Sequence, residues 1–229
     1  MKKIKNDIYQ KANSIYSQNG TFVMLSSFVV WASIFFLGLF PLFGFGLGFF
    51  AMCFLCLGFK KIILDLLTRK SPKIENVFDY AKFCLSAFCL KISTMALVFL
   101  WGLLFVVPGI VMGLNFVYAP YILAEDPKIG TIKAMQQSKK MVYGQRGNIF
   151  VLYLTMALAV VLSALVFCFL IIILNMLIAL PIWLNIVLPL VLTAFVFFVF
   201  ILPYFEIVFA SMYQQIKSAE KSAKTLKQA

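Results

Sequence analysis

The stretch GNIFVLYLTMALAVVLSALVFCFLIIILNMLIALPIWLNIVLPLVLTAFVFFVFILPYF, residues 147–205, contains no Asp, Glu, Lys or Arg. The hydrocarbon core of a bilayer is about 30 Å thick, and a helix that crosses it needs roughly 20 apolar residues. At 59 residues, the stretch is too long for one crossing and about right for two. It therefore predicts a hairpin of two membrane-spanning helices that leaves and returns on the same side.

Two further stretches without charged residues lie upstream, at 12–59 and 92–124, and are 48 and 33 residues long. Both exceed the length of a single span, so they predict two more hairpins. The composition agrees, because 63% of residues are hydrophobic and 12% are charged, against about a quarter charged in soluble domains. We predict an all-α polytopic membrane helix bundle with six spans, over about 21–40, 43–59, 83–106, 109–124, 149–174 and 187–212.

Lysine and arginine are concentrated in four segments beside and between these stretches, at 1–11, 60–91, 125–146 and 217–229. Segments rich in Lys and Arg remain in the cytoplasm by the positive-inside rule. Both termini and every charged connection are therefore expected to be cytoplasmic, with short uncharged turns outside and no cleaved signal peptide. This distribution accounts for the net charge of +12, so nucleic acid is not an expected partner.

The first charged segment predicts a cytoplasmic interfacial helix over 1–18. Ile4, Ile8 and Ala12 recur at helical spacing with lysines between them, a pattern typical of a helix lying on a membrane surface. Its expected partners are the anionic headgroups of the inner leaflet. Asn19-Gly20 is expected to end this helix, before a single membrane domain over 19–216 and a basic cytoplasmic tail over 217–229.

Two amphipathic cytoplasmic helices are expected between the hairpins, over about 74–82 and 127–143. The second follows Asp126, a good N-cap, with Pro127 at the first helical position, where its missing N–H has no cost. Gly144 is a plausible residue to end it. The two helices would place most of the soluble surface on the cytoplasmic side.

The middle hairpin needs residues upstream of its charge-free stretch, which brings Lys91 into the span 83–106. Lys91 lies only a turn or two from the cytoplasmic end, close enough for its ammonium to reach the headgroups. Pro108-Gly109 is expected to form the outer turn, and a re-entrant loop is the alternative for this segment. In the last hairpin we expect an outer link over 175–189 and a kink at Pro203.

Glu206 is the one acidic residue inside a predicted span, which makes it the first candidate for a binding role. A carboxylate in lipid is costly, so such residues face the bundle, pair with a cation, or mark a solute pathway. The alternative is that the span ends early and Glu206 lies at the inner interface within reach of a cytoplasmic lysine. Substitution by Gln separates these interpretations.

Asn115 and Tyr121 are two further candidate binding residues. Asn115 would hydrogen-bond across helices or contact a polar solute. Tyr121, with Tyr118, flanks Pro120 near the inner face, where an aromatic belt or a lipid-headgroup site both fit.

Enzyme chemistry has little support in the sequence, and no cofactor is expected. There is no histidine, no Gly-x-Ser-x-Gly motif, and no acidic pair placed opposite a nucleophile. Cys53 and Cys56 have a redox or zinc spacing, but they lie within a predicted span without a second pair. Glu125 and Asp126 fit helix capping better than a metal site.

From about residue 100 onward the chain resembles a known family. The matching residues are Pro108-Gly109-Ile110, the run Tyr118-Ala119-Pro120-Tyr121-Ile122-Leu123-Ala124-Glu125-Asp126-Pro127, then Ala134, Ser138, Met141, Gly144 and Phe150, and last Pro203-Tyr204, Phe209-Ala210 and Tyr213. In these residues, strongest over 100–150 and 201–213, it looks like a divergent member of the bacterial integral membrane family called domain of unknown function 975. The resemblance implies a multi-pass bundle in the bacterial cytoplasmic membrane, and the family has no assigned activity.

Two functions remain open from the sequence. The first is a non-enzymatic membrane protein that acts through contacts with lipids or with a protein partner in the membrane. The second is a subunit of a small-solute or lipid transporter or channel that uses polar groups in spans 4 and 6. Convergence of Glu206 and Asn115 on a polar cavity would favour the second, and a fully packed bundle would exclude it. Protection against a membrane-active peptide is a third possibility on which the sequence is silent.

Overall fold

The computed structural model describes residues 2–38, 44–68, 72–177 and 181–228, and all regular structure in these ranges is helical. The predicted all-α fold class is thus confirmed. The elements in chain order are α1 (Lys2–Gly38), α2 (Gly44–Leu67), the 3₁₀ helix η1 (Ile74–Phe83), α3 (Cys84–Leu104), α4 (Val106–Asn115), α5 (Ala119–Glu125), α6 (Thr131–Val142), α7 (Arg146–Leu177), α8 (Ile182–Val196), the π-helical turn η2 (Phe197–Ile201) and α9 (Leu202–Gln228).

Four helical segments of the described chain are long and apolar enough to cross a membrane, and they coincide with the last four predicted spans. The predicted spans 21–40 and 43–59 lie on α1 and α2 but run into residues 39–43, which are outside the described residues. The number six therefore remains a prediction. The four segments are Val77–Leu104, Val106–Glu125, Arg146–Asn175 and Val187–Glu220.

The expected break at Asn19-Gly20 is present as a kink within α1. Asn19 has non-helical backbone angles (φ −125°, ψ 15°), and helix continues on both sides of it. Asn and Gly are among the weaker helix formers, which explains why the two halves meet there. The expected helix over 74–82 is present as the 3₁₀ helix η1, whose Val77 backbone packs directly against Gly58 of α2.

The outer turn of the middle hairpin lies at Phe105, so the prediction that Pro108-Gly109 forms it is wrong. Phe105 is extended (φ −157°, ψ 142°), and Pro108 lies in the first turn of α4, where a missing N–H is tolerated. Gly109 serves helix packing, because a Cβ there would come within 2.8 Å of the Gly102 Cα on α3. The glycine lets the two helices touch backbone to backbone.

The predicted fourth span, 109–124, is two helices and not one. α4 ends at Asn115, and α5 begins at Ala119 with Pro120 in its first turn. A proline that continued α4 would lack the N–H for the helical ladder and clash with the preceding turn. The break turns the chain inward, so that the side chains of α5 are almost all buried.

The helix predicted over 127–143 begins four residues later, at Thr131. Asp126 does not cap it, because its carboxylate accepts the amide N–H of Lys128 (3.1 Å) in a local turn. The N-cap is Gly130, whose positive φ of 80° only glycine adopts easily. At the other end the prediction is confirmed, since Gly144 has the left-handed φ of 86° typical of a helix terminus.

The long outer link predicted over 175–189 is wrong, because α8 already begins at Ile182 and carries Pro189 inside it. Helix then continues through η2 into α9 without a break. Pro203 is accommodated by the π-helical turn before it, since widening the helix relieves the clash of its ring with the carbonyl four residues earlier. The predicted tail 217–229 extends α9 as far as Gln228.

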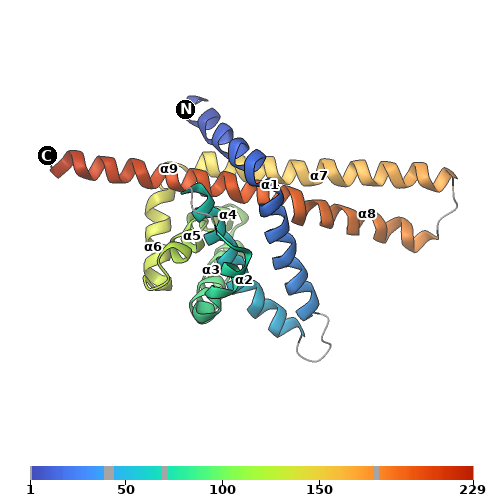
Figure 1. The fold of residues 1–229 in the computed structure, drawn as a ribbon, viewed down its shortest axis with the longest axis horizontal. Coiled ribbons are helices and arrows are strands. Elements are labelled where there is room, and N and C mark those ends of the chain that lie inside the picture. The colour runs from blue at the N-terminus through green and yellow to red at the C-terminus, as the bar shows by residue number, and fades with distance from the viewer. Residues whose placement is uncertain (1, 39–43, 69–71, 178–180, 229) are drawn as a thin grey trace.

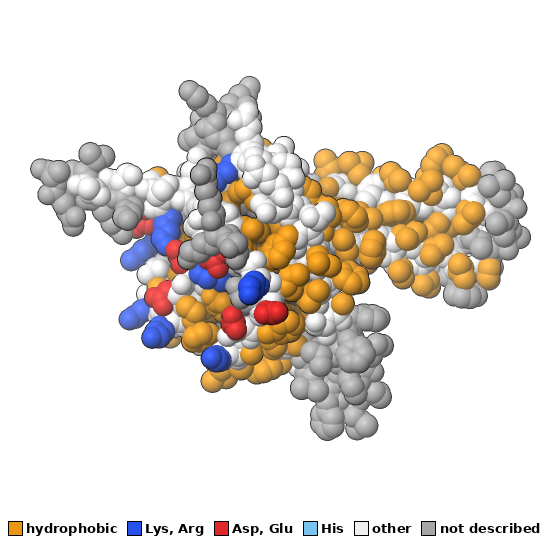
Figure 2. Space-filling view, in the orientation of Figure 1, with side chains coloured by type: hydrophobic (Ala, Val, Ile, Leu, Met, Phe, Trp, Pro, Cys, Tyr) orange, Lys and Arg blue, Asp and Glu red, His pale blue; other side chains and the backbone are white. Residues whose placement is uncertain are grey.

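The α7–α8 hairpin extends from the body along the long axis, whereas the α1–α2 hairpin points downward at a steep angle to it (Figure 1). A bundle of three hairpins side by side is therefore not observed. The 32 residues of α7 span about 48 Å at 1.5 Å per residue. Only 6% of the residues in its most apolar 18-residue stretch are buried. Figure 2 shows hydrophobic side chains over this arm and charged ones gathered on the opposite side of the body.

Candidate functional site

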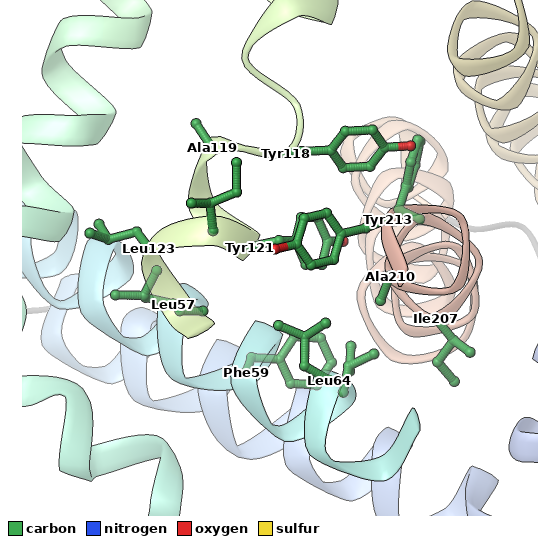
Figure 3. Packing of buried hydrophobic residues seen from close by; sticks show 14 of the residues in the cluster. Leu57, Phe59, Leu64, Tyr118, Ala119, Tyr121, Leu123, Ile207, Ala210 and Tyr213 are labelled. Carbon is green, nitrogen blue, oxygen red and sulfur yellow. The ribbon is translucent and has the colours of Figure 1, made fainter. Parts of the chain in front are cut away.

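The core of the body is the place where α2, α5 and α9 meet, and it holds the candidate site. Leu57 and Leu64 of α2, Leu123 of α5 and Ile207 of α9 are all at most 5% exposed (Figure 3). Three tyrosines lie beside them, one before α5, one on it and one on α9. Their ring centroids are 6.2 Å (Tyr118–Tyr121), 5.7 Å (Tyr118–Tyr213) and 5.8 Å (Tyr121–Tyr213) apart.

Glu206 of α9 forms an ion pair with Lys60 of α2 within this core. The Lys60 Nζ donates to both carboxylate oxygens, at 2.7 and 2.6 Å, and the side chains are only 15% and 20% exposed. Tyr121 donates its hydroxyl to the same carboxylate, and the Lys60 Nζ lies 4.2 Å from the centroid of the Tyr121 ring. The structure thus brings two of the three predicted site residues together and adds Lys60 to them.

A second polar contact joins α5 to α9 nearer the surface. Glu125 accepts hydrogen bonds from the Tyr213 hydroxyl (2.6 Å) and the Lys217 Nζ (2.5 Å). The side chains of Glu125 and Lys217 are 41% and 52% exposed, so solvent screens this ion pair. The expectation that Glu125 and Asp126 stabilise the start of the following helix is wrong for both residues.

Asn115, the third predicted site residue, lies apart from this pair and fixes α6. Its backbone carbonyl accepts the Ser138 hydroxyl (2.7 Å), and its side-chain oxygen accepts the Arg146 Nε–H (3.0 Å). Ser138 also accepts the amide N–H of Tyr118 (3.2 Å). These bonds tie the break between α4 and α5 to α6 and to the start of α7, so Asn115 has a packing role.

A cleft of about 620 Å³ opens beside the Lys60–Glu206 pair, lined by α1, α2, α3, the α4–α5 segment, α7 and α9. Its walls are mainly aliphatic and aromatic side chains, among them Trp31, Met52 and Val98. Lys60, Glu206 and Lys91 are its charged lining residues, and Asn115 is not part of it. The cleft has the size of a small-molecule pocket, for which about 300–1,000 Å³ is usual.

The cleft combines one acidic and two basic side chains with mainly apolar walls. Within the described ranges, no group of three or more His, Cys, Asp or Glu side chains is placed to hold a metal ion. Cys53 and Cys56 are free thiols, and the Cys53 thiol donates to the Phe49 carbonyl (3.2 Å) within its own helix. Both thiols lie on the apolar helix α2, the position that the sequence predicts.

Lys60 is the residue that sequence reasoning did not name. The signal was present, because Lys60 directly follows the charge-free stretch 12–59, as Glu206 directly follows 147–205. Two charges at the cytoplasmic ends of two charge-free stretches lie at similar depth in a bilayer, which makes them candidates for pairing. Because Lys60 and Glu206 are 146 positions apart in the sequence, no local sequence pattern predicts that they pair.

Comparison with models of known protein families, with curated proteins and with solved structures finds no match. The resemblance to domain of unknown function 975 therefore rests on the quoted residues alone and remains an expectation.

Proposed function

We propose that the chain is a multi-pass protein of a bacterial cytoplasmic membrane that acts through lipid or protein contacts in the membrane, without catalysing a reaction. The observation that carries the proposal is the exposed apolar surface of its helices. Phe99 and Leu103 of α3 and Leu165 and Phe169 of α7 are 60–69% exposed. Soluble monomers rarely expose contiguous apolar patches beyond a few hundred Å².

The proposed topology has six spans with both termini in the cytoplasm. The positive-inside rule supports it, because the lysines and arginines lie in the four segments that join or flank the hairpins. Spans in known structures are tilted by about 0–40° from the bilayer normal. Because the α1–α2 and α7–α8 hairpins diverge, all six spans cross together only if these hairpins move closer to parallel.

A single experiment tests the proposed mode of action. The full chain is purified in mild detergent and inserted into nanodiscs of zwitterionic lipid, with or without anionic lipid. We expect incorporation in both, together with either a co-purifying membrane protein or an enrichment of anionic lipid around the chain. A chain that stays out of the nanodiscs, or that enters them with neither enrichment, contradicts the proposal.

A transporter or channel subunit is the second candidate, and the Lys60–Glu206 pair beside the cleft favours it. Transporters place charged residues near the substrate path, and this pair lies beside a cleft. The charges of Lys60 and Glu206 cancel each other, however. Asn115 hydrogen-bonds with Arg146 and does not line the cleft. Flux of a solute across proteoliposomes that Glu206→Gln abolishes, while the protein stays folded, would establish this function instead.

A further inference from the structure

The cleft beside Glu206 carries one positive charge that no described acid neutralises. Lys60 and Glu206 cancel each other through their ion pair. Lys91 also lines the cleft, and no described carboxylate lies within ion-pair distance of it. The lining therefore has a net charge of about +1, which suits a ligand with one negative charge.

Along α2 and α3 the apolar lining extends beyond the charged residues, toward the N-terminus of α2 and the C-terminus of α3. On α2 the lining runs from Lys60 back to Met52, and on α3 it runs from Ala87 through Lys91 to Phe99. Met52 lies eight residues from Lys60, and Phe99 lies eight residues from Lys91, about 12 Å along a helix. The cleft thus leads from its charged residues into a region walled mainly by apolar side chains.

In the proposed topology, the step from charged to apolar lining residues runs the same way as the step from headgroup to acyl chains in an inner-leaflet lipid. The chain follows α2 toward the cytoplasm and α3 away from it, so Lys60 and Lys91 both lie toward the cytoplasmic side. Phosphates of the inner leaflet lie at that level, and acyl chains point from there to the bilayer centre. The apolar walls offer few groups that could replace the hydration of a water-soluble anion, but they match an acyl chain.

We propose that the cleft holds one acyl chain of an anionic phospholipid of the inner leaflet, with the phosphate against Lys91. The proposal rests on the membrane function above and makes it specific, because it names the class of lipid and the place where it binds. Lys60 and Glu206 form the polar end wall, and their mutual pairing leaves Lys91 to bind the phosphate. The second acyl chain remains in the surrounding bilayer.

Trp31 lines the cleft and supplies the probe. A variant with Trp101→Phe and Trp183→Phe keeps Trp31 as the sole tryptophan of the three in the chain. It is reconstituted with phosphatidylglycerol or phosphatidylcholine whose acyl chains carry bromine, which quenches tryptophan fluorescence on contact. We expect the affinity of the site for phosphatidylglycerol to be about fivefold higher than its affinity for phosphatidylcholine. This is the ratio that about 1 kcal/mol per lysine near an anionic lipid produces.

Matched variants locate the effect. Lys91→Met should reduce the ratio of the affinities for phosphatidylglycerol and phosphatidylcholine to about one. Lys82 is an exposed lysine outside the cleft, so Lys82→Met should leave this ratio unchanged. Val98→Phe, which fills the cleft, should protect Trp31 from both lipids, whereas Leu103→Phe on the exposed face of α3 should not. A Lys91→Met variant that keeps the full preference overturns the proposal, even if the fold is intact.

The remaining outcomes separate the two proposals. If the protein incorporates into bilayers but both lipids quench Trp31 equally, the lipid site is wrong and the membrane function stands. If the protein does not incorporate, the membrane function itself is wrong. If brominated oleate displaces phosphatidylglycerol at equal concentration, the occupant is a free fatty acid and the phospholipid assignment is overturned.

Discussion

Lys60→Met tests whether the Lys60–Glu206 pair holds α2 against α9. Methionine keeps an unbranched stem of similar length and removes the ammonium, so Glu206 retains only the hydrogen bond from Tyr121. Removing one partner of a fully buried pair costs about 3–5 kcal/mol, and exposed pairs contribute about 0–1 kcal/mol. With side chains 15% and 20% exposed, we expect a loss of about 2–3 kcal/mol in the free energy of unfolding.

The measurement is thermal unfolding in detergent micelles, followed by circular dichroism. For a chain of this length, about 2–3 kcal/mol corresponds to a fall of about 5–10 °C in Tm. The control is Lys61→Met on the same helix turn, whose pair with Asp65 is longer (3.4 Å) and of the i,i+4 type. Such helical pairs contribute about 0.3–0.5 kcal/mol, so Tm should fall by about 1–2 °C.

A double-mutant cycle isolates the interaction itself. Glu206→Gln alone leaves a partly buried ammonium opposite an amide, and the double variant Lys60→Met/Glu206→Gln leaves no charge in the core. We expect the double variant to be more stable than the sum of the single losses by about 1–3 kcal/mol. Additive losses, or a Lys60→Met variant as stable as Lys61→Met, would show that the ion pair does not hold α2 against α9.

Three further substitutions probe other contacts. Gly109→Leu places a side chain on Gly102 and should cost about 1–3 kcal/mol by forcing α3 and α4 apart, measured as a fall in Tm that Gly113→Ala does not cause. Ser138→Ala leaves the Asn115 carbonyl and a backbone N–H without partners, so amide exchange in α6 should accelerate by about one to two orders of magnitude, for a cost of about 1–3 kcal/mol. Lys217→Met breaks a solvent-screened ion pair and a distant contact (6.0 Å) with the Tyr213 ring, so its Tm should stay within about 2 °C of the wild-type value.

The helix content and the four helical segments long and apolar enough to cross a membrane follow from the charge pattern. In a membrane, a long stretch without charge has few alternatives to a helix that satisfies its own backbone. The turns are harder to predict. Pro108-Gly109 fits a turn and also the first turn of a helix, and only the approach of Gly109 to Gly102 decides between them. Asp126 fits an N-cap, but its carboxylate accepts the amide N–H of Lys128 in a local turn instead of capping the helix.

The candidate site was predictable in part. The sequence indicates that Glu206 pairs with a cytoplasmic lysine or faces a pathway, and the structure shows the pairing together with a position beside the cleft. Tyr121 joins it because the break at Pro120 turns α5 into the core, and residue patterns do not encode that direction. Hydropathy likewise does not predict the angle between the α1–α2 and α7–α8 hairpins, because it indicates which residues lie in the membrane and not how the helices are oriented to one another.

The proposed topology assigns each segment to one side of a membrane, and cysteine labelling in intact cells measures that assignment. Single cysteines are placed at residues 17, 41, 105, 181 and 225 of a chain otherwise free of cysteine, and labelled with a membrane-impermeant reagent. We expect labelling from outside at 41, 105 and 181, and labelling at 17 and 225 only after the cells are opened. Outside labelling at 17 or 225, or protection at 105 and 181, would contradict it, and protection at 41 alone would reduce six spans to four.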